Sequence, residues 1–431
     1  MDKIRILQLS DIHWVVKPRA LDKYQTLRDA LIRDLEQYCE TKEEKFDSLL
    51  ICGDIAQSGS SAEYDKAKEF INLVCKSIGC NESEVYVVPG NHDKDRKAGN
   101  PVLRRPINAG LACEKGNDEM FHDLMQNGVE VVCTLYKPFL HYEAFSQIYE
   151  NSEPLMHKCI HEFDKEDFTI DVDNDEMFWH RPLAEDLSGY TLYLYGFNTA
   201  LTCDENDFNV DKGHKMYLSK FAYNNIPAEE GKCIRMSMMH HPLSFIADKD
   251  EISKILDRLF AVQLYGHVHC SESQQETKYG PLKVFSGAMQ PPSGGDKNKY
   301  RPVYNMIELS VKEDNDNKVY LEVKLTVHKW NEDSVSFQND EEASATFFID
   351  VTEQNRWAQR TEVESIELPK GVTKRHIRVK FIERRDGRQL IETFYPGLYD
   401  WKQTAYVNNQ RFLEKIRLDN RWIELWNKIK D

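Results

Sequence analysis

The first ninety residues alternate short apolar runs with longer stretches of helical period. Apolar runs at 4–9, 48–52 and 84–88 have the length and side-chain types of buried strands. Between them, residues 23–39 and 62–78 place apolar side chains three and four positions apart, as on one face of a helix. Strands that alternate with helices are typical of a layered α/β fold, so we expect this fold class.

The alternation stops after residue 93. Residues 94–188 are polar and aromatic, with helical stretches and few strand-like runs, and they are too long for a bare loop in a compact domain. We therefore interpret them as an inserted cap. A polar stretch near 330–345 then closes a large domain at 1–345, and we expect a small, basic, aromatic-rich C-terminal domain at 346–431. Further strand-like runs lie at 190–195, 233–239, 262–265, 282–285, 303–309 and 319–327.

Charge is unevenly distributed along the chain. The whole chain has a net charge of −16, whereas residues 370–431 contain fifteen basic and eight acidic side chains, a local net charge of +7. An acidic protein is a poor candidate for wrapping nucleic acid, because such binding depends on neutralising phosphates. Several roles are open to the basic C-terminal domain: docking on the acidic part of its own chain, oligomerisation, or binding of a partner protein or nucleic acid.

The sequence gives no sign of a membrane segment or a secretory route. It contains no run of eighteen apolar residues, and its start lacks the long apolar stretch of a signal peptide. The ten cysteines are scattered singly, without a CxxC pair. We therefore expect reduced thiols in a cytoplasmic protein.

Residues with metal-ligating side chains follow the strand-like runs directly. Because the loops beyond the carboxyl ends of strands converge on one side of a layered α/β fold, residues far apart in sequence can meet there. The alternating spacing of the histidines in GHVH sends both imidazoles to the same face of an extended segment. The residues concerned are Asp11, His13, Asp54, Asn91, His92, His240, His241, His267 and His269.

The collected side chains are carboxylates, imidazoles and one amide oxygen, without a thiolate. This set suits Mn²⁺, Fe or Zn²⁺ better than a thiolate-seeking metal, and it exceeds what one ion needs. Because a carboxylate has two oxygens and can bridge, the ligands divide naturally into two sites that share an Asp. Two ions about 3.5–4 Å apart lower the pKa of a bridging water and neutralise phosphate charge, so the sequence predicts a dinuclear centre for phosphoryl chemistry.

The motifs DIH, GDIAQSG, GNHD, MMHHP and YGHVH occur in this order along the chain. Together they resemble the calcineurin-like metallophosphoesterase superfamily, and the resemblance covers roughly residues 1–310. It implies a four-layer α/β/β/α sandwich in which two mixed sheets pack together under flanking helices. It also implies one metal held by Asp11, His13 and His269, a second metal held by Asn91, His240 and His267, and Asp54 as the bridge between them.

The same resemblance gives roles to further residues. His92 is expected to stabilise the transition state or to protonate the leaving oxygen without binding metal. His240 is preferred to His241 as the ligand because it is followed by x-Pro, which leaves His241 as a supporting group. Asp93 is expected to orient an imidazole. Gln57 stands where purple acid phosphatases carry a tyrosine, so an Fe(III)–tyrosinate centre is not expected.

The predicted function is metal-dependent hydrolysis of phosphodiesters or phosphomonoesters by direct attack of a metal-bridging hydroxide, with Mn²⁺ as the favoured cofactor. The segments ILQLSDIH and MMHHPL resemble the branch that contains cyclic-nucleotide phosphodiesterases, which favours a small nucleotide-type substrate. The alternative is a DNA or RNA nuclease, because the repair-nuclease branch shares the same motifs and the basic C-terminal domain could contact phosphates. A phosphoprotein phosphatase and a non-catalytic protein-interaction scaffold also stay open, as do the native metal pair and the oligomeric state.

Overall fold

The computed structural model describes most of the chain. Its description covers residues 1–16, 24–112, 116–127, 129–165, 168, 170, 175–204, 215–224, 226, 231–290, 301–352, 369, 377, 380–381, 384, 386–399, 401, 405–418 and 421–430. The chain divides into two compact units, Met1–Arg360 and Thr361–Asp431, and each is described by itself.

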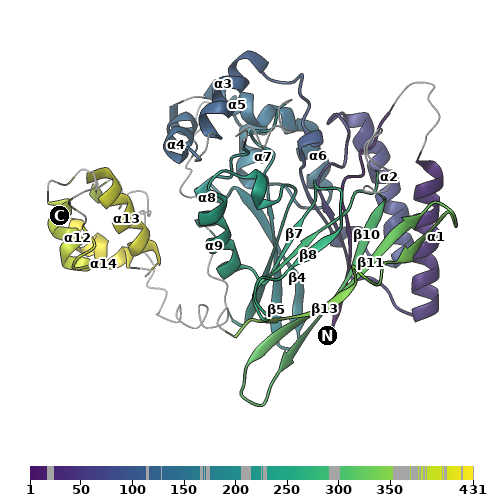
Figure 1. Cartoon of the computed structure of the whole chain (residues 1–431). Coiled ribbons are helices and arrows are strands. Elements are labelled where there is room, and N and C mark those ends of the chain that lie inside the picture. Colours follow the sequence, from purple (N-terminus) through teal and green to yellow (C-terminus); the bar gives the residue numbers. More distant parts are fainter. Residues whose placement is uncertain are drawn as a thin grey trace. The chain divides into compact units, whose positions relative to one another are not determined.

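A seven-stranded sheet forms one half of the first unit (Figure 1). Its strand order is β12-β11-β10-β1-β2-β3, and β13 also pairs with β11. The strands β1, β2 and β3 pair in parallel, whereas the later strands pair antiparallel with their neighbours. The bounds are β1 (Ile4–Leu9), β2 (Ser48–Cys52), β3 (Val85–Val88), β10 (Val303–Glu313), β11 (Val319–Asn331), β12 (Ser336–Asn339) and β13 (Ala345–Asp350).

A six-stranded sheet in the order β4-β5-β6-β7-β9-β8 forms the other half of the unit. Its central strands, from β5 through β6 and β7 to β9, are parallel, and antiparallel strands close both edges. The carboxyl ends of the central strands therefore lie at one edge of this sheet. The bounds are β4 (Phe178–Leu187), β5 (Tyr190–Phe197), β6 (Cys233–Met239), β7 (Val262–Tyr265), β8 (Glu272–Gln274) and β9 (Leu282–Phe285).

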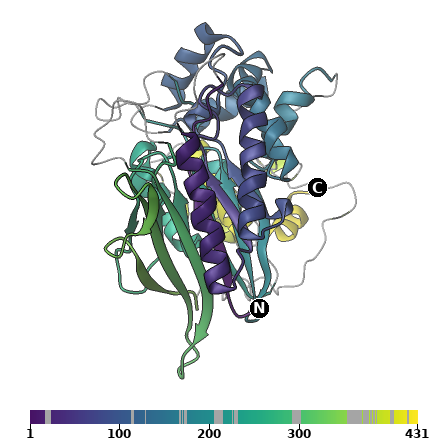
Figure 2. The same cartoon turned by 90° about the vertical axis from the view of Figure 1, so that its right-hand side faces the viewer.

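The two sheets pack face to face between helices. In β1, Ile4 and Ile6 belong to one apolar core and Leu7 and Leu9 to another, because successive side chains of a strand point to opposite faces. The core that holds Ile6 also holds Met236 from β6, so it lies between the sheets. Helices cover the outer faces (Figures 1 and 2). The four-layer α/β/β/α sandwich expected from the sequence is confirmed.

The flanking helices have clear sequence signals. Helices α1 (Gln25–Lys42) and α2 (Ser61–Ile78) lie side by side against the seven-stranded sheet (Figure 2). At the start of α2, the carboxylate of Glu63 accepts a hydrogen bond of 3.2 Å from the backbone N–H of Ser60, which satisfies a donor that the helix leaves unpaired. None of the helices in the described ranges combines the length with the apolar composition that a membrane crossing requires. Further short elements are α8 (Lys220–Asn224), α9 (Lys249–Leu259), η1 (Glu82–Glu84), η2 (Asn91–Asp93) and η5 (Leu243–Phe245).

Within the described residues, five α-helices lie between β3 and β4 in the chain and form the cap at the top of Figure 1. The range that the sequence indicated for the cap, 94–188, also contains β4, which pairs with β5 in the six-stranded sheet. The pairing shifts register on both sides of Ala184, so β4 lacks the strict alternation by which strands are found in a sequence. The cap helices are α3 (Pro101–Leu111), α4 (Asp118–Asn127), α5 (Val129–Tyr136), α6 (Leu140–Ile148) and α7 (Pro154–His161), with η3 (Lys137–Phe139) before α6.

The cap also covers the edge of the seven-stranded sheet. In the part of the chain that the structure describes, the edge strand β3 has no neighbour beyond it in the sheet, and an unpaired buried edge is costly. The side chain of Asn151 serves as that neighbour: its Oδ1 accepts from Val87 N at 3.2 Å, and its Nδ2 donates to Val85 O at 3.1 Å. The indole N–H of Trp179 donates to Val87 O at 3.1 Å.

The second unit has an apolar core of its own. Its described helices are α12 (Gly387–Phe394), α13 (Ala405–Leu418) and α14 (Trp422–Ile429), and Phe381, Phe412 and Leu425 are buried among them. The sequence suggested that this part begins at residue 346, whereas the units divide after Arg360. The difference arises because β13 pairs with β11 and so belongs to the first unit. The sequence did not indicate this strand, because Ile349 is its only buried side chain.

Replacing Asn151 by Ala should destabilise the first unit. The change leaves the buried N–H of Val87 and the buried C=O of Val85 without partners, which costs about 1–3 kcal/mol for each group. We expect the free energy of unfolding, measured by urea titration, to fall by about 2–6 kcal/mol. Asn81→Ala, at an exposed asparagine before η1, is the matched control and should change little. An equal effect of both substitutions would contradict the edge role of Asn151.

Candidate metal centre

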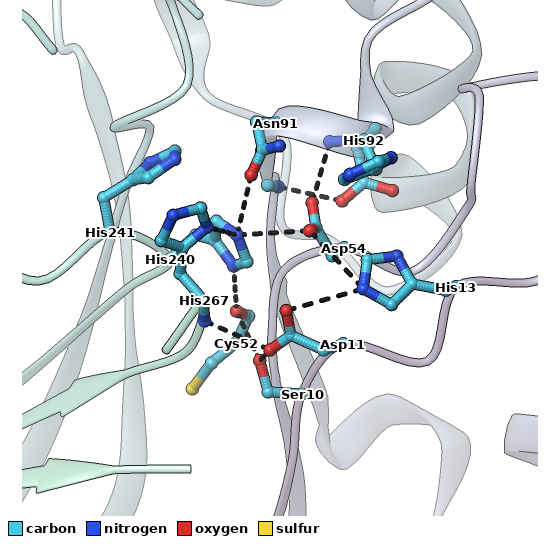
Figure 3. A network of polar contacts seen from close by, with 12 residues as sticks. Ser10, Asp11, His13, Cys52, Asp54, Asn91, His92, His240, His241 and His267 are labelled. Carbon is cyan, nitrogen blue, oxygen red and sulfur yellow. Dashed lines mark hydrogen bonds and ion pairs between the residues drawn. The ribbon is translucent and has the colours of Figure 1, made fainter. Parts of the chain in front are cut away.

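The predicted ligands lie where the strand ends of both sheets meet (Figure 3). Asp11, Asp54 and Asn91 follow β1, β2 and β3 of one sheet within three residues. His240 and His267 follow β6 and β7 of the other sheet within two residues. The sequence argument that strand ends bring distant residues together therefore holds for these two parallel sets of strands.

Backbone hydrogen bonds fix the loops after β1 and β2 relative to each other. The N–H of Asp11 donates to the C=O of Gly53 at 3.1 Å, and the N–H of His13 donates to the C=O of Asp54 at 2.9 Å. The N–H of Trp14 then donates to the C=O of Ile55 at 3.0 Å. These bonds continue the parallel pairing beyond the strands, so both acidic loops are held as extensions of the sheet.

The backbone is left-handed at five of the predicted metal ligands. Their φ angles are 53° for Asp11, 49° for His13, 52° for Asp54, 69° for His267 and 57° for His269. Non-glycine residues adopt this region rarely, at a cost of order 1–3 kcal/mol each, and only where the surrounding structure enforces it. Such strain gathers at functional sites, and here it coincides with the residues that the sequence indicated.

A first group of donors consists of Asp11, His13 and His269. The Nε2 of His269 is 3.0 Å from Asp11 Oδ1, and the Nε2 of His13 is 3.7 Å from the same oxygen. The donor atoms of the three residues all lie within 4.8 Å of one another. This is the set that the sequence suggested for the first metal.

A second group surrounds His240. Its Nε2 is 3.4 Å from Asp54 Oδ2, 3.2 Å from Asn91 Oδ1 and 3.2 Å from His267 Nδ1. Its Nδ1 donates to the backbone oxygen of Cys52 at 2.8 Å, which fixes the ring and leaves Nε2 directed at the other donors. Asp54, Asn91, His240 and His267 therefore meet as the sequence predicted for the second metal and the bridge.

Further hydrogen bonds orient the carboxylate of Asp11. The hydroxyl of Ser10 donates to Asp11 Oδ2, and the backbone N–H of His267 donates to the same oxygen at 3.1 Å. The other carboxylate oxygen thus remains directed at His269 and His13. The strand-end signal covered Asp11 but passed over Ser10, because a serine at a strand end is more often an ordinary turn residue.

The electrostatics of the cluster favour cations. Burial disfavours the charged forms of Asp11 and Asp54, but neighbouring histidines outweigh it and hold both pKa values below the usual carboxyl range. These are His269 and His240 at Asp11, and chiefly His240 at Asp54. Burial likewise opposes the charge of His240, yet Asp54 raises its pKa to about 9. Burial and the neighbouring His240 lower the pKa of His267 to about 3. The cluster therefore offers ionised carboxylates beside a neutral imidazole.

This donor set fits two divalent cations. Metal ligands must be deprotonated, and ionised carboxylates with neutral imidazoles meet that requirement. Burial also lowers the pKa of His13, whose Nε2 faces Asp11 Oδ1 at 3.7 Å and Asp54 Oδ2 at 3.8 Å. A bound cation would replace the proton on His240 as the positive charge between the carboxylates.

His92 lies in the cluster beside His13 and Asp54, and donor atoms of these three residues all lie within 4.8 Å of one another. Its backbone N–H donates to Asp54 Oδ1 at 2.8 Å. Its Nδ1 is 2.9 Å from the backbone oxygen of Gln57 and 2.8 Å from the Gln57 side-chain nitrogen. Since Nδ1–H can donate to that carbonyl, Nε2 is left free for a substrate, and the ring is only partly buried. Gln57 thus has a contact that the sequence comparison with purple acid phosphatases did not foresee.

Asp93 supports the loops rather than an imidazole. Its carboxylate accepts hydrogen bonds from the backbone N–H groups of Ile55, Ala56 and Gly90 at 3.2, 2.9 and 2.8 Å. The hydroxyl of Tyr64 donates to it at 2.9 Å. The expectation that Asp93 orients an imidazole is therefore corrected: it joins the loop after β2 to the loop after β3, because four donors already saturate its oxygens.

His241 lies behind the second group of donors. Its Nδ1 and its backbone N–H both contact the hydroxyl of Thr199, at 2.9 and 3.0 Å, and its Nε2 is 3.6 Å from Cys203 Sγ. Its ring centroid is 4.6 Å from that of His267. Both ring nitrogens thus have contacts on the side of Thr199 and Cys203, and donor atoms of His241, His240 and His267 also lie within 4.8 Å of one another. Thr199 follows β5, so the strand-end rule could have found it, whereas a single threonine carries no other signal.

Replacing Gly90 by Ala should weaken metal binding. The backbone of Gly90 is extended (φ −106°) and accepts any residue, but a Cβ there would lie 2.2 Å from Asp54 Oδ1. Because displaced or unsupported ligands typically cost 10–100-fold in metal affinity, we expect a loss of about tenfold or more, measured by isothermal titration with Mn²⁺. Gly387→Ala, where the nearest atom would be 3.8 Å away, is the control. Unchanged Mn²⁺ affinity in Gly90→Ala would show that Asp54 does not bind the metal.

Comparisons with known proteins place the chain among its relatives. Residues 4–271 match the family described as calcineurin-like phosphoesterase. The uncharacterized metallophosphoesterase-like protein YydB of Bacillus subtilis (strain 168) is 26% identical over 344 residues, which cover 76% of this chain and 60% of that protein. The chain therefore spans less than two thirds of the length of this relative.

Two solved structures give weaker similarities. GAP50, the anchor in the inner membrane complex of Plasmodium, is 13% identical and aligns over 77% of this chain and 89% of its own, with a TM-score of 0.38. The purple acid phosphatase PPD1 of yellow lupin (Lupinus luteus) is 10% identical and aligns over 81% and 54%, with a TM-score of 0.34. The family assignment depends on the sequence match, which spans more than half of the chain and contains the five motifs. On that match the chain belongs to the calcineurin-like phosphoesterase family.

Proposed function

We propose that this chain hydrolyses phosphoesters with two divalent cations bound at the strand ends. One observation carries the proposal: Asp54 Oδ2 lies 3.8 Å from the Nε2 of His13 and 3.4 Å from the Nε2 of His240. A single carboxylate oxygen thus stands between the two groups of donors, which is the position of a bridging ligand. Family membership supports the same reading.

The ligand assignment follows the two groups. Asp54 would be shared by both cations, which would lower the pKa of a water and neutralise the charge of the phosphate. Oxygen and imidazole donors without a thiolate suit Mn²⁺, Fe or Zn²⁺, and we favour Mn²⁺. Asp11, His13 and His269 would hold one cation, and Asn91, His240 and His267 the other.

His92 is proposed as the general acid. The fixed Nδ1 contact with Gln57 and the partly exposed ring leave Nε2 as the atom that can reach a leaving oxygen. The ring centroid of His92 is 4.9 Å from that of His13, so a phosphate bound at the cluster would lie beside it. The backbone bond from His92 to Asp54 fixes this side chain relative to the proposed bridging ligand.

The proposed substrate is a small phosphodiester or phosphomonoester of the nucleotide type. Residues 1–369 carry a net charge of −23, which repels long polyanions more than small ones. The motif resemblance to cyclic-nucleotide phosphodiesterases points the same way. A nuclease is the second candidate, and the observation in its favour is the basic segment 370–431.

A substrate panel tests the activity. Bis-p-nitrophenyl phosphate and p-nitrophenyl phosphate should be hydrolysed with added Mn²⁺ and not after removal of metal by chelation. Faster turnover of cyclic nucleotides than of single- or double-stranded DNA would support the small substrate, and the reverse order would support the nuclease. Bound metal without hydrolysis of any of these substrates would favour the scaffold over an enzyme.

His92→Ala should lower kcat and leave the metal content unchanged. Removal of a general acid typically costs 10²–10⁴-fold. Because p-nitrophenolate leaves readily without a proton, we expect the loss to be larger for an alkyl phosphodiester than for bis-p-nitrophenyl phosphate. His141→Ala, at a partly buried histidine of the cap, is the control. Loss of metal together with activity would mean that His92 is a ligand, and equal losses on both substrates would exclude the acid role.

A further inference from the structure

A second cluster of ligand-type side chains lies in the cap, on α6 and α7. Glu143 and Gln147 are four positions apart on α6, and His157 and His161 are four positions apart on α7. Residues at this spacing lie on one face of a helix, so each helix presents two polar side chains to the other. The four residues share no member with the donors at the strand ends.

The donor atoms of this cluster converge on one carboxylate. Glu143 Oε1 is 2.8 Å from His157 Nδ1, and Glu143 Oε2 is 2.6 Å from His161 Nε2. One donor atom from each of the three residues Glu143, His157 and His161 lies within 4.8 Å of the other two. The side chain of Glu143 is fully buried, whereas those of His157 and His161 are 45% and 39% exposed. An ion could therefore enter from solvent between the imidazoles and meet a buried anion.

Neither protonation state of His157 Nδ1 gives a good hydrogen bond to all of its neighbours. Gln147 Nε2 contacts both Glu143 Oε1 and His157 Nδ1, the latter at 2.7 Å. If Nδ1 carries a proton for Glu143, it faces the amide N–H as a second donor. If Nδ1 carries no proton, its lone pair faces the carboxylate oxygen at 2.8 Å. A cation between these atoms would remove the conflict, because it would bond to both lone pairs.

The carboxylate is also prepared as a ligand. The hydroxyl of Ser152 donates to Glu143 Oε1 at 3.0 Å and so orients the group from outside the cluster. An oriented carboxylate beside two imidazoles is the kind of ligand set found at three-ligand zinc sites that leave one position to water.

We propose that Glu143, His157 and His161 bind one zinc-type divalent cation that ties α6 to α7. Two imidazoles and one carboxylate suit Zn²⁺, and Co²⁺ would substitute for it. With Zn–ligand bonds of about 2.0–2.1 Å, tetrahedral ligand atoms are about 3.3 Å apart, so the contacts of 2.8 and 2.6 Å need to open by only about 0.5 and about 0.7 Å. This site is independent of the proposed hydrolysis.

Zinc stoichiometry of the full chain tests the site. Chelator-treated protein is incubated with ZnCl₂, desalted, and analysed for bound zinc by mass spectrometry. The double variant His157→Asn/His161→Asn should retain one equivalent less than the wild type, and Glu143→Gln should do the same. His141→Ala, on the same helix α6 and outside the cluster, should match the wild type. Equal zinc content in all four proteins would overturn the proposal.

Cobalt separates this site from the strand-end centre. Co²⁺ held by few ligands in tetrahedral geometry absorbs visible light strongly, and this signal should be present in wild type and His141→Ala but lost in the double variant. Circular dichroism and thermal unfolding in chelator check that the variants are folded, and the exposed histidines make that outcome expected. An unchanged cobalt spectrum in a folded double variant would contradict the site, whatever the hydrolysis assays show.

Discussion

Two buried carboxylates, Asp11 and Asp54, are the constraint on which the rest of the first unit depends. Each is at most 1% exposed at the carboxyl end of a parallel strand, and a buried anion is costly unless it is paired and hydrogen-bonded. Their surroundings supply compensation from both sheets: His269 and His240 contact them, and Ser10 donates to Asp11. The histidines of the second sheet are therefore bound to the acids of the first by electrostatics as well as by packing.

A third buried carboxylate, Asp93, extends this constraint into the scaffold. The negative charge of nearby Asp54 adds to burial and raises the pKa of Asp93 to about 6, so its backbone donors and Tyr64 are needed to keep it ionised near neutral pH. The ring of Tyr64 packs on Phe145 of α6, with centroids 4.9 Å apart. The cap helix that carries Glu143 thus packs against the side chain that holds the acidic loops together, and a cation joining α6 to α7 would stiffen that support.

The sequence predicted most of the candidate site because strand ends are both a local signal and a spatial one. Asp11, Asp54, Asn91, His240 and His267 each follow an apolar run, and parallel strands bring such positions to one edge. The groups that orient the predicted ligands were harder to find in the sequence, because their role depends on three-dimensional contacts. Nothing in the sequence shows that the oxygen of Cys52 accepts from an imidazole, since every residue carries a backbone oxygen.

In the fold, too, features marked by a local sequence pattern were predicted, whereas features that depend on contacts between distant residues were not. The layered α/β class follows from strand and helix periodicity, whereas the four-layer sandwich was implied by the resemblance of the motifs; the structure puts Ile4 and Ile6 of β1 in one core and Leu7 in the other. The strands β4 and β13 escaped detection because bulges and mostly exposed side chains remove their alternation. The partner of the edge strand β3 escaped for a stronger reason: a single side chain, Asn151, replaces a strand, and no periodicity marks it.

Metal binding at the strand ends would act on folding as well as on chemistry. One group of donors combines Asp11 and His13 from the seven-stranded sheet with His269 from the loop after β7, and the other joins Asn91 to His240. A cation in either group therefore contacts both sheets, so its binding free energy adds to the free energy that holds the sandwich together. The left-handed backbone at five of these proposed ligands is then strain that bound cations would help to offset. The proposed chemistry and the stability of the fold would thus depend on the same few loops.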